Sequence, residues 1–132
     1  MIKRGNPPYL ECSSKGDKRF SAFYARIKAR NNKSIEEIYQ AAKIFEDGST
    51  GLSWKEAKGK KAVNMSKVAM LYDSLWVEYL FENHDLFNIV LNSSGFSDIF
   101  GKEGCQCQAD TLCRIKEVYI KHAKGGTVNH ES

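Results

Sequence analysis

The stretch Ser34-Ile-Glu-Glu-Ile-Tyr-Gln-Ala-Ala-Lys43 decides how the chain is organised, because it predicts both a helix and a polar face on that helix. Ser34 and Glu37 form a capping box, the pattern that opens a helix by bonding backbone N–H groups that lack a partner in its first turn. Apolar side chains recur at helical spacing from this point: Ile35, Ile38, Tyr39, Ala42 and Phe45. We therefore expect a packed helix that ends near Gly48, a residue type typical of helix ends.

Glu36, Gln40 and Lys43 form a second stripe beside the apolar one, because successive members are four and three residues apart. One interpretation is a solvated flank, in which a Glu-to-Lys ladder contributes roughly a few tenths of a kcal/mol. The other interpretation is the wall of a polar cleft, where a carboxylate, an amide and an amine face the same ligand. The spacing alone leaves both open.

Four segments resemble the NADAR family, also called YbiA-like, in the order in which that family has them. Ser34-Ile35-Glu36 with Tyr39-Gln40-Ala41-Ala42-Lys43 is similar to the signature helix S-V-E-H-x-Y-Q-A-x-K. Phe20-Ser-Ala-Phe-Tyr24 resembles the family's L-S-N-F-Y element, Ala57-Lys-Gly-Lys-Lys61 its A-K-x-L-G-R segment, and Asp98-Ile-Phe-Gly101 its D-x-x-W-G element. The resemblance extends over about residues 20–116 and implies an α+β fold.

The resemblance implies an enzyme, an N-glycosidase that hydrolyses a ribose–nitrogen bond without a metal or another cofactor. Its substrate would be a nucleotide or other small molecule containing ADP-ribose, or ADP-ribosylated guanine in nucleic acid. Such a reaction passes through an oxocarbenium-like sugar, which a nearby carboxylate stabilises. Carried over by position, the catalytic residues are Glu36 as the key carboxylate, Lys43 and Asp98. The substrate-binding residues are Phe23, Tyr24, Tyr39, Gln40, Trp54, Lys58, Lys60, Phe100 and Gly101.

Three positions depart from the family pattern and keep other functions open. Glu37 stands where His is usual, Ala22 where Asn is usual, and Phe100 where Trp is usual. The first alternative is a catalytically inactive protein that binds and sequesters a nucleotide or ADP-ribose, in a phage or defence system. The second is a sequence-independent nucleic-acid binder, whose affinity would fall steeply with salt. It would use the basic residues of the early region: Lys15, Lys18, Arg19, Arg26, Lys28, Arg30 and Lys33.

The composition is that of a soluble globular protein, with 42% apolar and 27% charged residues. A chain of 132 residues suits a single domain, which we place at residues 1–124, with a flexible tail at 125–132. No apolar run approaches the roughly 20 residues of a membrane span, and no signal peptide is recognisable, so we expect a cytoplasmic protein without a membrane partner. The net charge of +4 is too small to indicate a nucleic-acid binder, but it is compatible with a phosphate-bearing ligand.

The remaining elements predict a mainly helical α+β domain, with a small N-terminal sheet packed against about five helices. Residues 9–12 suit a strand, and residues 20–28 suit a strand or extended segment that pairs with it. Helices are expected at 53–59 behind a second capping box, at 66–83 as the central core helix, after a cap at Asp85, and at 109–122. Residues 96–101 suit a compact loop between two helices.

Three local features each allow two interpretations. Trp54, at a junction between loop and helix, is either a hydrophobic plug or a ring that faces a ligand. Asp98, a single acid among apolar residues, either caps a turn or lies in a pocket with a shifted pKa. The basic residues around Gly59, including Lys58 and Lys60, form either a solvated face or a phosphate contact.

The cysteines and histidines do not predict a metal site. Cys105 and Cys107 form C-x-C, and Cys113 follows after five residues, without the C-x2-C pairs of structural zinc sites. The three histidines have no recognisable ligand spacing. We expect reduced thiols, as in other cytosolic proteins.

Overall fold

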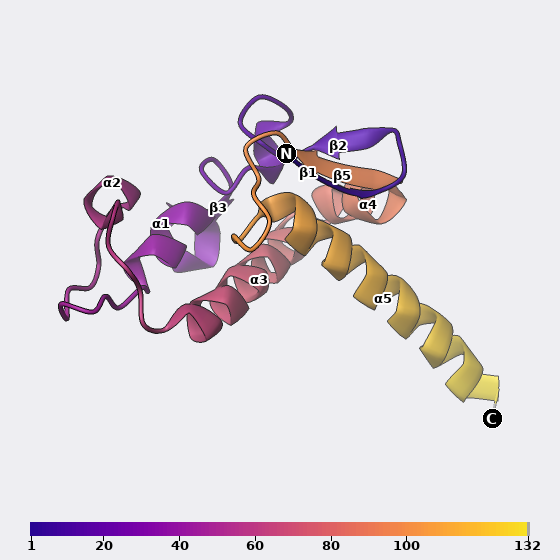
Figure 1. Cartoon of the computed structure of the whole chain (residues 1–132). Helices are drawn as coiled ribbons and strands as arrows, with labels where there is room; N and C mark the ends of the chain where they lie inside the picture. The colour runs from indigo at the N-terminus through magenta and orange to yellow at the C-terminus, as the bar shows by residue number, and fades with distance from the viewer. Residues whose placement is uncertain (132) are drawn as a thin grey trace.

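A three-stranded sheet brings the start of the chain together with a strand from its last third (Figure 1). The computed structural model describes the backbone of residues 1–131 and the side chains of residues 1–123, which form a single small α+β domain. The sheet order is β1 (Ile2–Gly5), β5 (Gly95–Asp98), β2 (Tyr9–Glu11). β5 runs antiparallel to β1 and parallel to β2. The central strand therefore comes from a segment remote in sequence from both of its partners.

The loop predicted at residues 96–101 is wrong in its first half, because β5 occupies Gly95–Asp98 and all four of its residues are buried. Its polar residues, Ser97 and Asp98, are buried by the partners they find in the fold and give no alternating apolar pattern in the sequence. Gly95 admits the close approach of β2, since a Cβ there would lie 2.7 Å from the Tyr9 ring.

The strand predicted at residues 9–12 is confirmed over Tyr9–Glu11, but its predicted pairing with residues 20–28 is wrong. That later segment folds on itself. It contains the short helix η1 (Lys18–Phe20), β3 (Arg26–Ile27) and the short helix η2 (Lys28–Arg30), and β3 pairs with β4 (Lys33–Ser34). Two consecutive asparagines, Asn31 and Asn32, adopt φ values of 58° and reverse the chain between these two strands.

The opening helix α1 (Ile35–Ala41) begins as predicted, with both bonds of the capping box: the Ser34 hydroxyl accepts from the Glu37 N–H at 3.1 Å, and Glu37 Oε1 accepts from the Ser34 N–H at 3.2 Å. The predicted end near Gly48 is wrong. The chain leaves the helix after Ala42, and Ile44 and Phe45 form β-bridges instead. Buried Phe45 therefore packs as part of a bridge, while Lys43 stays beside α1 through a backbone bond to Gln40.

The central core helix is α3 (Met65–Glu82), close to the predicted 66–83. Its fully buried side chains include Leu75 and Trp76, and it packs on α1, α4 and α5. α2 (Trp54–Ala57) has the predicted capping box between Ser53 and Glu56. α4 (His84–Asn92) begins one residue before Asp85, so Asp85 lies in its first turn and is not its cap.

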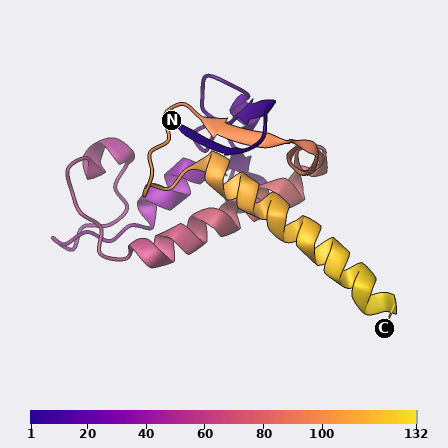
Figure 2. The same cartoon turned by 45° about the vertical axis from the view of Figure 1, so that its right-hand side comes forward.

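The last helix, α5 (Gln108–Glu131), starts under the sheet and extends beyond the rest of the molecule (Figures 1 and 2). It contains the predicted helix at 109–122 and continues past it. The side chains of residues 124–132 lie outside the described part, and the flexibility of residues 125–132 stays a prediction. Among the described residues, no helix is long and apolar enough to cross a membrane.

Candidate functional site

A cleft of about 650 Å³ opens between α1, the start of α3 and the loop that joins β5 to α5. Both ribbon views place this loop beside α1 (Figures 1 and 2). Eight of the twelve residues expected from the resemblance line the cleft: Phe23, Glu36, Tyr39, Gln40, Lys43, Asp98, Phe100 and Gly101. The polar stripe of α1 is therefore the wall of a cleft, which decides between the two interpretations that the spacing allowed.

Glu36 is the partly buried carboxylate of this wall. Its Oε1 accepts a hydrogen bond from Gln40 Nε2 at 2.7 Å, one helical turn further along. Burial raises the pKa of Glu36, and the bond from Gln40 and the charge of Lys43 only partly oppose this. A carboxyl with a raised pKa in a cleft is a candidate for proton transfer.

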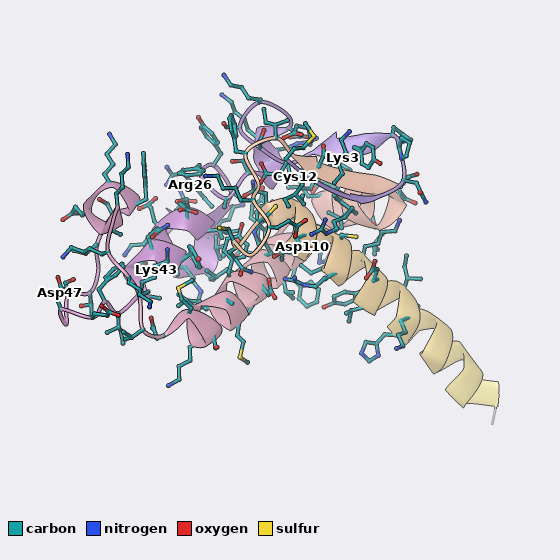
Figure 3. The ribbon with its side chains drawn as sticks, in the orientation of Figure 1. Lys3, Cys12, Arg26, Lys43, Asp47 and Asp110 are labelled. Carbon is teal, nitrogen blue, oxygen red and sulfur yellow. The ribbon has the colours of Figure 1, made fainter. Side chains whose placement is uncertain are left out.

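Lys43 is partly buried next to Glu36, and Figure 3 labels it beside α1. Its ammonium lies 4.6 Å from the centre of the Tyr39 ring, close enough for a cation–π interaction. Burial lowers the pKa of Lys43, against the charge of Glu36. The charged forms of Glu36 and Lys43 are thus both disfavoured by burial and favoured by each other.

Asp98 lies across the cleft at the end of β5 and is only 3% exposed. Its Oδ1 accepts from the Phe100 N–H at 3.0 Å, which caps the turn after the strand. Its Oδ2 accepts from Gln108 Nε2 at 2.5 Å and from the Cys107 thiol at 3.4 Å. The sequence allowed Asp98 to be either a turn cap or a pocket residue, and in the structure it caps a turn and also lines the cleft.

Buried Tyr72 of α3 connects the two walls. Its hydroxyl donates to Gln108 Oε1 at 3.3 Å, and its ring meets the Tyr39 ring edge-on at 5.0 Å between centres. Gln108 in turn bonds Asp98, so a continuous set of contacts runs from α1 to β5. This arrangement fixes the position of Asp98 relative to the helix that carries Glu36.

The loop after β5 forms the rim of the cleft. Gly101 is required there because a Cβ would lie 2.6 Å from Ile2 Cγ1 of β1. Phe100 next to it is 60% exposed and lines the cleft. Lys102 and Cys105 line the same rim.

Two further clefts, of about 530 and 370 Å³, lie on the α2 side of α1. Phe23, Glu36 and Gln40 line all three clefts. Trp54 lines the second and third and is 49% exposed, so it is not a buried plug. Lys58 lines the third cleft.

Two predicted binding residues lie outside all three clefts. Lys60 donates to Asp47 at 2.6 Å, and Figure 3 places Asp47 in the loop between α1 and α2, at the outer edge of the molecule. This bond is the main reason why the pKa of Asp47 is lowered. Tyr24 is half exposed, with the Lys18 ammonium 4.8 Å from its ring centre.

Several residues of the cleft were not predicted. Tyr72 has the helical spacing of a core residue and was assigned to the core, where most of its surface does lie. Gln108 and Lys102 follow β5 in segments without a recognisable motif, and the turn at Ser13 and Ser14 reaches the cleft only through the fold. No local signal in the sequence indicates that these residues meet α1.

The cysteines divide between core and surface. Cys12 and Cys107 are buried, and burial raises the pKa of Cys107 to about 11. Cys105 is exposed on the cleft rim. In the described part of the chain, no three histidine, cysteine or acidic side chains are grouped so that they could hold a metal ion.

No family model matches the chain, and no curated protein matches it.

Proposed function

We propose that the cleft binds a ribose-containing nucleotide or ADP-ribose derivative and hydrolyses its ribose–nitrogen bond, with Glu36 as the key carboxylate. The observation that carries this proposal is the position of Glu36, which is partly buried where three clefts meet and has a raised pKa. We also propose that the chain is related to the NADAR family and that the protein is cytoplasmic. Both rest on the sequence.

In the proposed step, water attacks the anomeric carbon of the ribose while the carbon–nitrogen bond breaks. The electron pair of that bond leaves with the nitrogen, and Glu36 accepts a proton from the attacking water; this proton then passes to the released nitrogen, which regenerates the carboxylate. Its ionised form also stabilises the positive charge that develops on the sugar. The raised pKa of Glu36 suits this role, because a more basic carboxylate accepts a proton more readily.

Lys43 and Lys102 are the cations of the first cleft and suit the phosphate of a nucleotide. Gln40 suits a ribose hydroxyl, because its Oε1 is buried without a protein partner. Asp98 already accepts from three protein donors. We therefore assign Asp98 a positioning role through Gln108 rather than the role of a second acid or base.

The three protein donors that already bond Asp98 also favour the second candidate function, a protein that binds the nucleotide without cleaving it. Such a protein needs the cleft and its cations, but it does not need a second group for proton transfer. Binding without turnover would raise thermal stability, by about 2.7 kcal/mol at a ligand concentration 100 times the dissociation constant.

The two candidates separate in one experiment. Wild type, Glu36→Gln and Glu46→Gln are incubated with ADP-ribosylated guanosine, ADP-ribosylated DNA, NAD and pyrimidine ribonucleotides, and the products are identified by mass spectrometry. Glu46 is the matched control, since it is an exposed glutamate outside the three clefts. Release of a free base by wild type and Glu46→Gln alone supports the glycosidase. A melting shift without any product supports the binding protein.

A further inference from the structure

The first two clefts adjoin each other at Glu36. Phe23, Glu36 and Gln40 line both, so each cleft reaches the same carboxylate from a different side. The first cleft extends from Glu36 towards Asp98, and the second extends towards Trp54. A substrate whose reacting bond lies at Glu36 therefore has room for one half on each side.

The second cleft has an aromatic corner. The rings of Phe23 and Trp54 meet edge-on with 6.5 Å between centres, yet Phe23 is 52% and Trp54 49% exposed. Trp76, the other tryptophan of the chain, is fully buried. The lining between the rings and α1 includes the apolar side chains of Ile38 and Leu52. Two large rings left open beside an apolar surface provide a place for a flat ligand to stack.

The charges of the two clefts differ. Among its lining residues the first cleft has two ammonium groups, Lys43 and Lys102, against the carboxylates of Glu36 and Asp98. The second cleft has three carboxylates, on Glu36, Glu37 and Glu56, against the single ammonium of Lys33. Phosphate is therefore favoured on the first side, and N–H donors are favoured on the second.

Neighbouring cations outside the lining offset the charge of the second cleft, but they leave carboxylate oxygens unbonded. Arg26 lies 3.6 Å from Glu37 Oε1, and Lys55 lies 5.7 Å from the Trp54 ring centre. Glu37 and Glu56 each use Oε1 in a capping box. The Oε2 atoms take no part in those capping bonds and can accept from a ligand.

We propose that the second cleft binds the leaving base of the substrate, a planar heterocycle with exocyclic amino groups. The ring stacks on Trp54 and meets the Phe23 ring edge-on, because the two rings are perpendicular, and its amino groups donate to the carboxylates of the cleft. The sugar and phosphate then lie in the first cleft, which places the ribose–nitrogen bond beside Glu36. This inference rests on the proposed function, because it assigns the group that the reaction releases.

The test uses free bases, which have no glycosidic bond and so report binding independently of turnover. 2,6-Diaminopurine and unsubstituted purine have the same ring system and differ in their amino groups. Each is titrated by calorimetry into wild type, Trp54→Ala, Trp54→Phe and Phe81→Ala, and tryptophan emission is followed in parallel. Phe81 is the matched control, because it is an aromatic residue of similar exposure that lines none of the three clefts.

We expect 2,6-diaminopurine to bind wild type at least about tenfold more tightly than purine, since it alone supplies amino donors for the carboxylates. Trp54→Ala should weaken its binding by about 5- to 150-fold, the range for loss of one stacking ring. Trp54→Phe should restore most of that loss, and Phe81→Ala should bind like wild type. The emission change should disappear in Trp54→Phe, because buried Trp76 then provides all the signal.

Equal affinity for the two bases, no binding of either, or an affinity unchanged in Trp54→Ala would overturn the inference. Its failure is distinguishable from failure of the proposed function. If the protein hydrolyses a substrate but fails this binding test, it is a glycosidase and the second cleft is not its base site. If it binds the bases as expected but hydrolyses nothing, the second cleft is a base site and the proposed reaction is wrong.

Discussion

Glu36 and Glu11 are both partly buried glutamates, but they differ in their hydrogen bonds and in the direction in which their pKa is shifted. Glu11 accepts from the Ser13 N–H, the Ser97 hydroxyl and the Ile99 N–H. Burial acts to raise the pKa of Glu11, but these bonds outweigh it and the pKa is lowered. Glu36 has one bond, from Gln40, and its pKa is raised. The comparison separates a carboxylate that holds two segments together from one that remains available to a ligand.

The same difference separates the two walls of the cleft. Asp98 at the end of β5 accepts from three protein donors, and Glu11 accepts from Ser97 of the same strand and from Ile99 directly after it. Glu36 on α1 and Lys43 directly after this helix are both partly buried, and burial works against the charged form of each. We infer that β5 supplies the rigid wall and α1 the reactive one, which is consistent with the tendency of shifted pKa values to gather at functional sites.

The largest expected effect is on activity. Glu36→Gln keeps the shape of the side chain but cannot accept a proton or stabilise a cationic sugar, so we expect kcat/KM to fall by about 10²- to 10³-fold on whichever substrate of the panel is cleaved. Steady-state kinetics with the Glu46→Gln control measure this. Unchanged kcat/KM in Glu36→Gln would remove Glu36 from the mechanism.

The second largest expected effect is on stability and concerns Asp98 of β5. Asp98→Ala leaves the Phe100 N–H and the Gln108 amide without their acceptor in a buried position, and should lower the free energy of unfolding by about 2–3 kcal/mol. Urea denaturation measures it. A loss below about 0.5 kcal/mol would show that Asp98 is not the brace that its contacts indicate.

Glu11→Gln should destabilise less, by about 1–2 kcal/mol at pH 7, because the amide keeps one acceptor oxygen. The folded-state pKa of Glu11 is lowered, so its stabilisation is present above the ordinary value of 4.5 and is lost as the pH falls through the folded-state pKa. The difference between wild type and variant should therefore shrink in acid. Denaturation curves across the acidic range test this, and a difference independent of pH would contradict it.

The smallest expected effect has the opposite sign. The folded-state pKa of Glu36 is raised, so the stabilisation from its protonated form is present below 4.5 and is lost as the pH rises through the folded-state pKa. Glu36→Gln should thus be more stable than wild type at pH 7, by about 0.5–1 kcal/mol, with the advantage disappearing in acid. Thermal melts of both proteins at pH 7 and below pH 4.5 measure this difference in stability. A variant less stable than wild type at pH 7 would make Glu36 a structural residue like Glu11.

The pieces of structure that the sequence predicts well are those whose cause is local. Both capping boxes form because their four residues interact within one helical turn. α3 matches its apolar pattern closely because an amphipathic stripe of that length is stable only as a helix against a core. Glu36, Gln40 and Lys43 line one cleft together, in agreement with the shared face that their spacing predicts.

The structural features that the sequence did not predict have non-local causes. β5 has two polar residues out of four, and it is a strand only because β1 and β2 supply backbone partners on both sides. The end of α1 depends on Asn64. Its Oδ1 accepts from the Ile44 N–H at 2.9 Å, and this bond holds Ile44 in the β-bridge that follows the helix. Lys60 bonds Asp47 across a loop, a contact that the segment around Lys60 does not predict, and its role toward a ligand stays a prediction. Each outcome depends on a partner that the local sequence does not contain.

For this protein, the sequence by itself determined where α1 starts and which of its side chains share a polar face, because capping and helical periodicity act over a few residues. Only the tertiary structure decided that Asp98 faces this helix, that Gln108 and Tyr72 join the two walls, and that Trp54 stays open to solvent. The physical reason is burial. The pKa of Glu36 and the solvent exposure of an aromatic ring depend on which surfaces the whole chain brings together, and these surfaces come from segments far apart in the sequence.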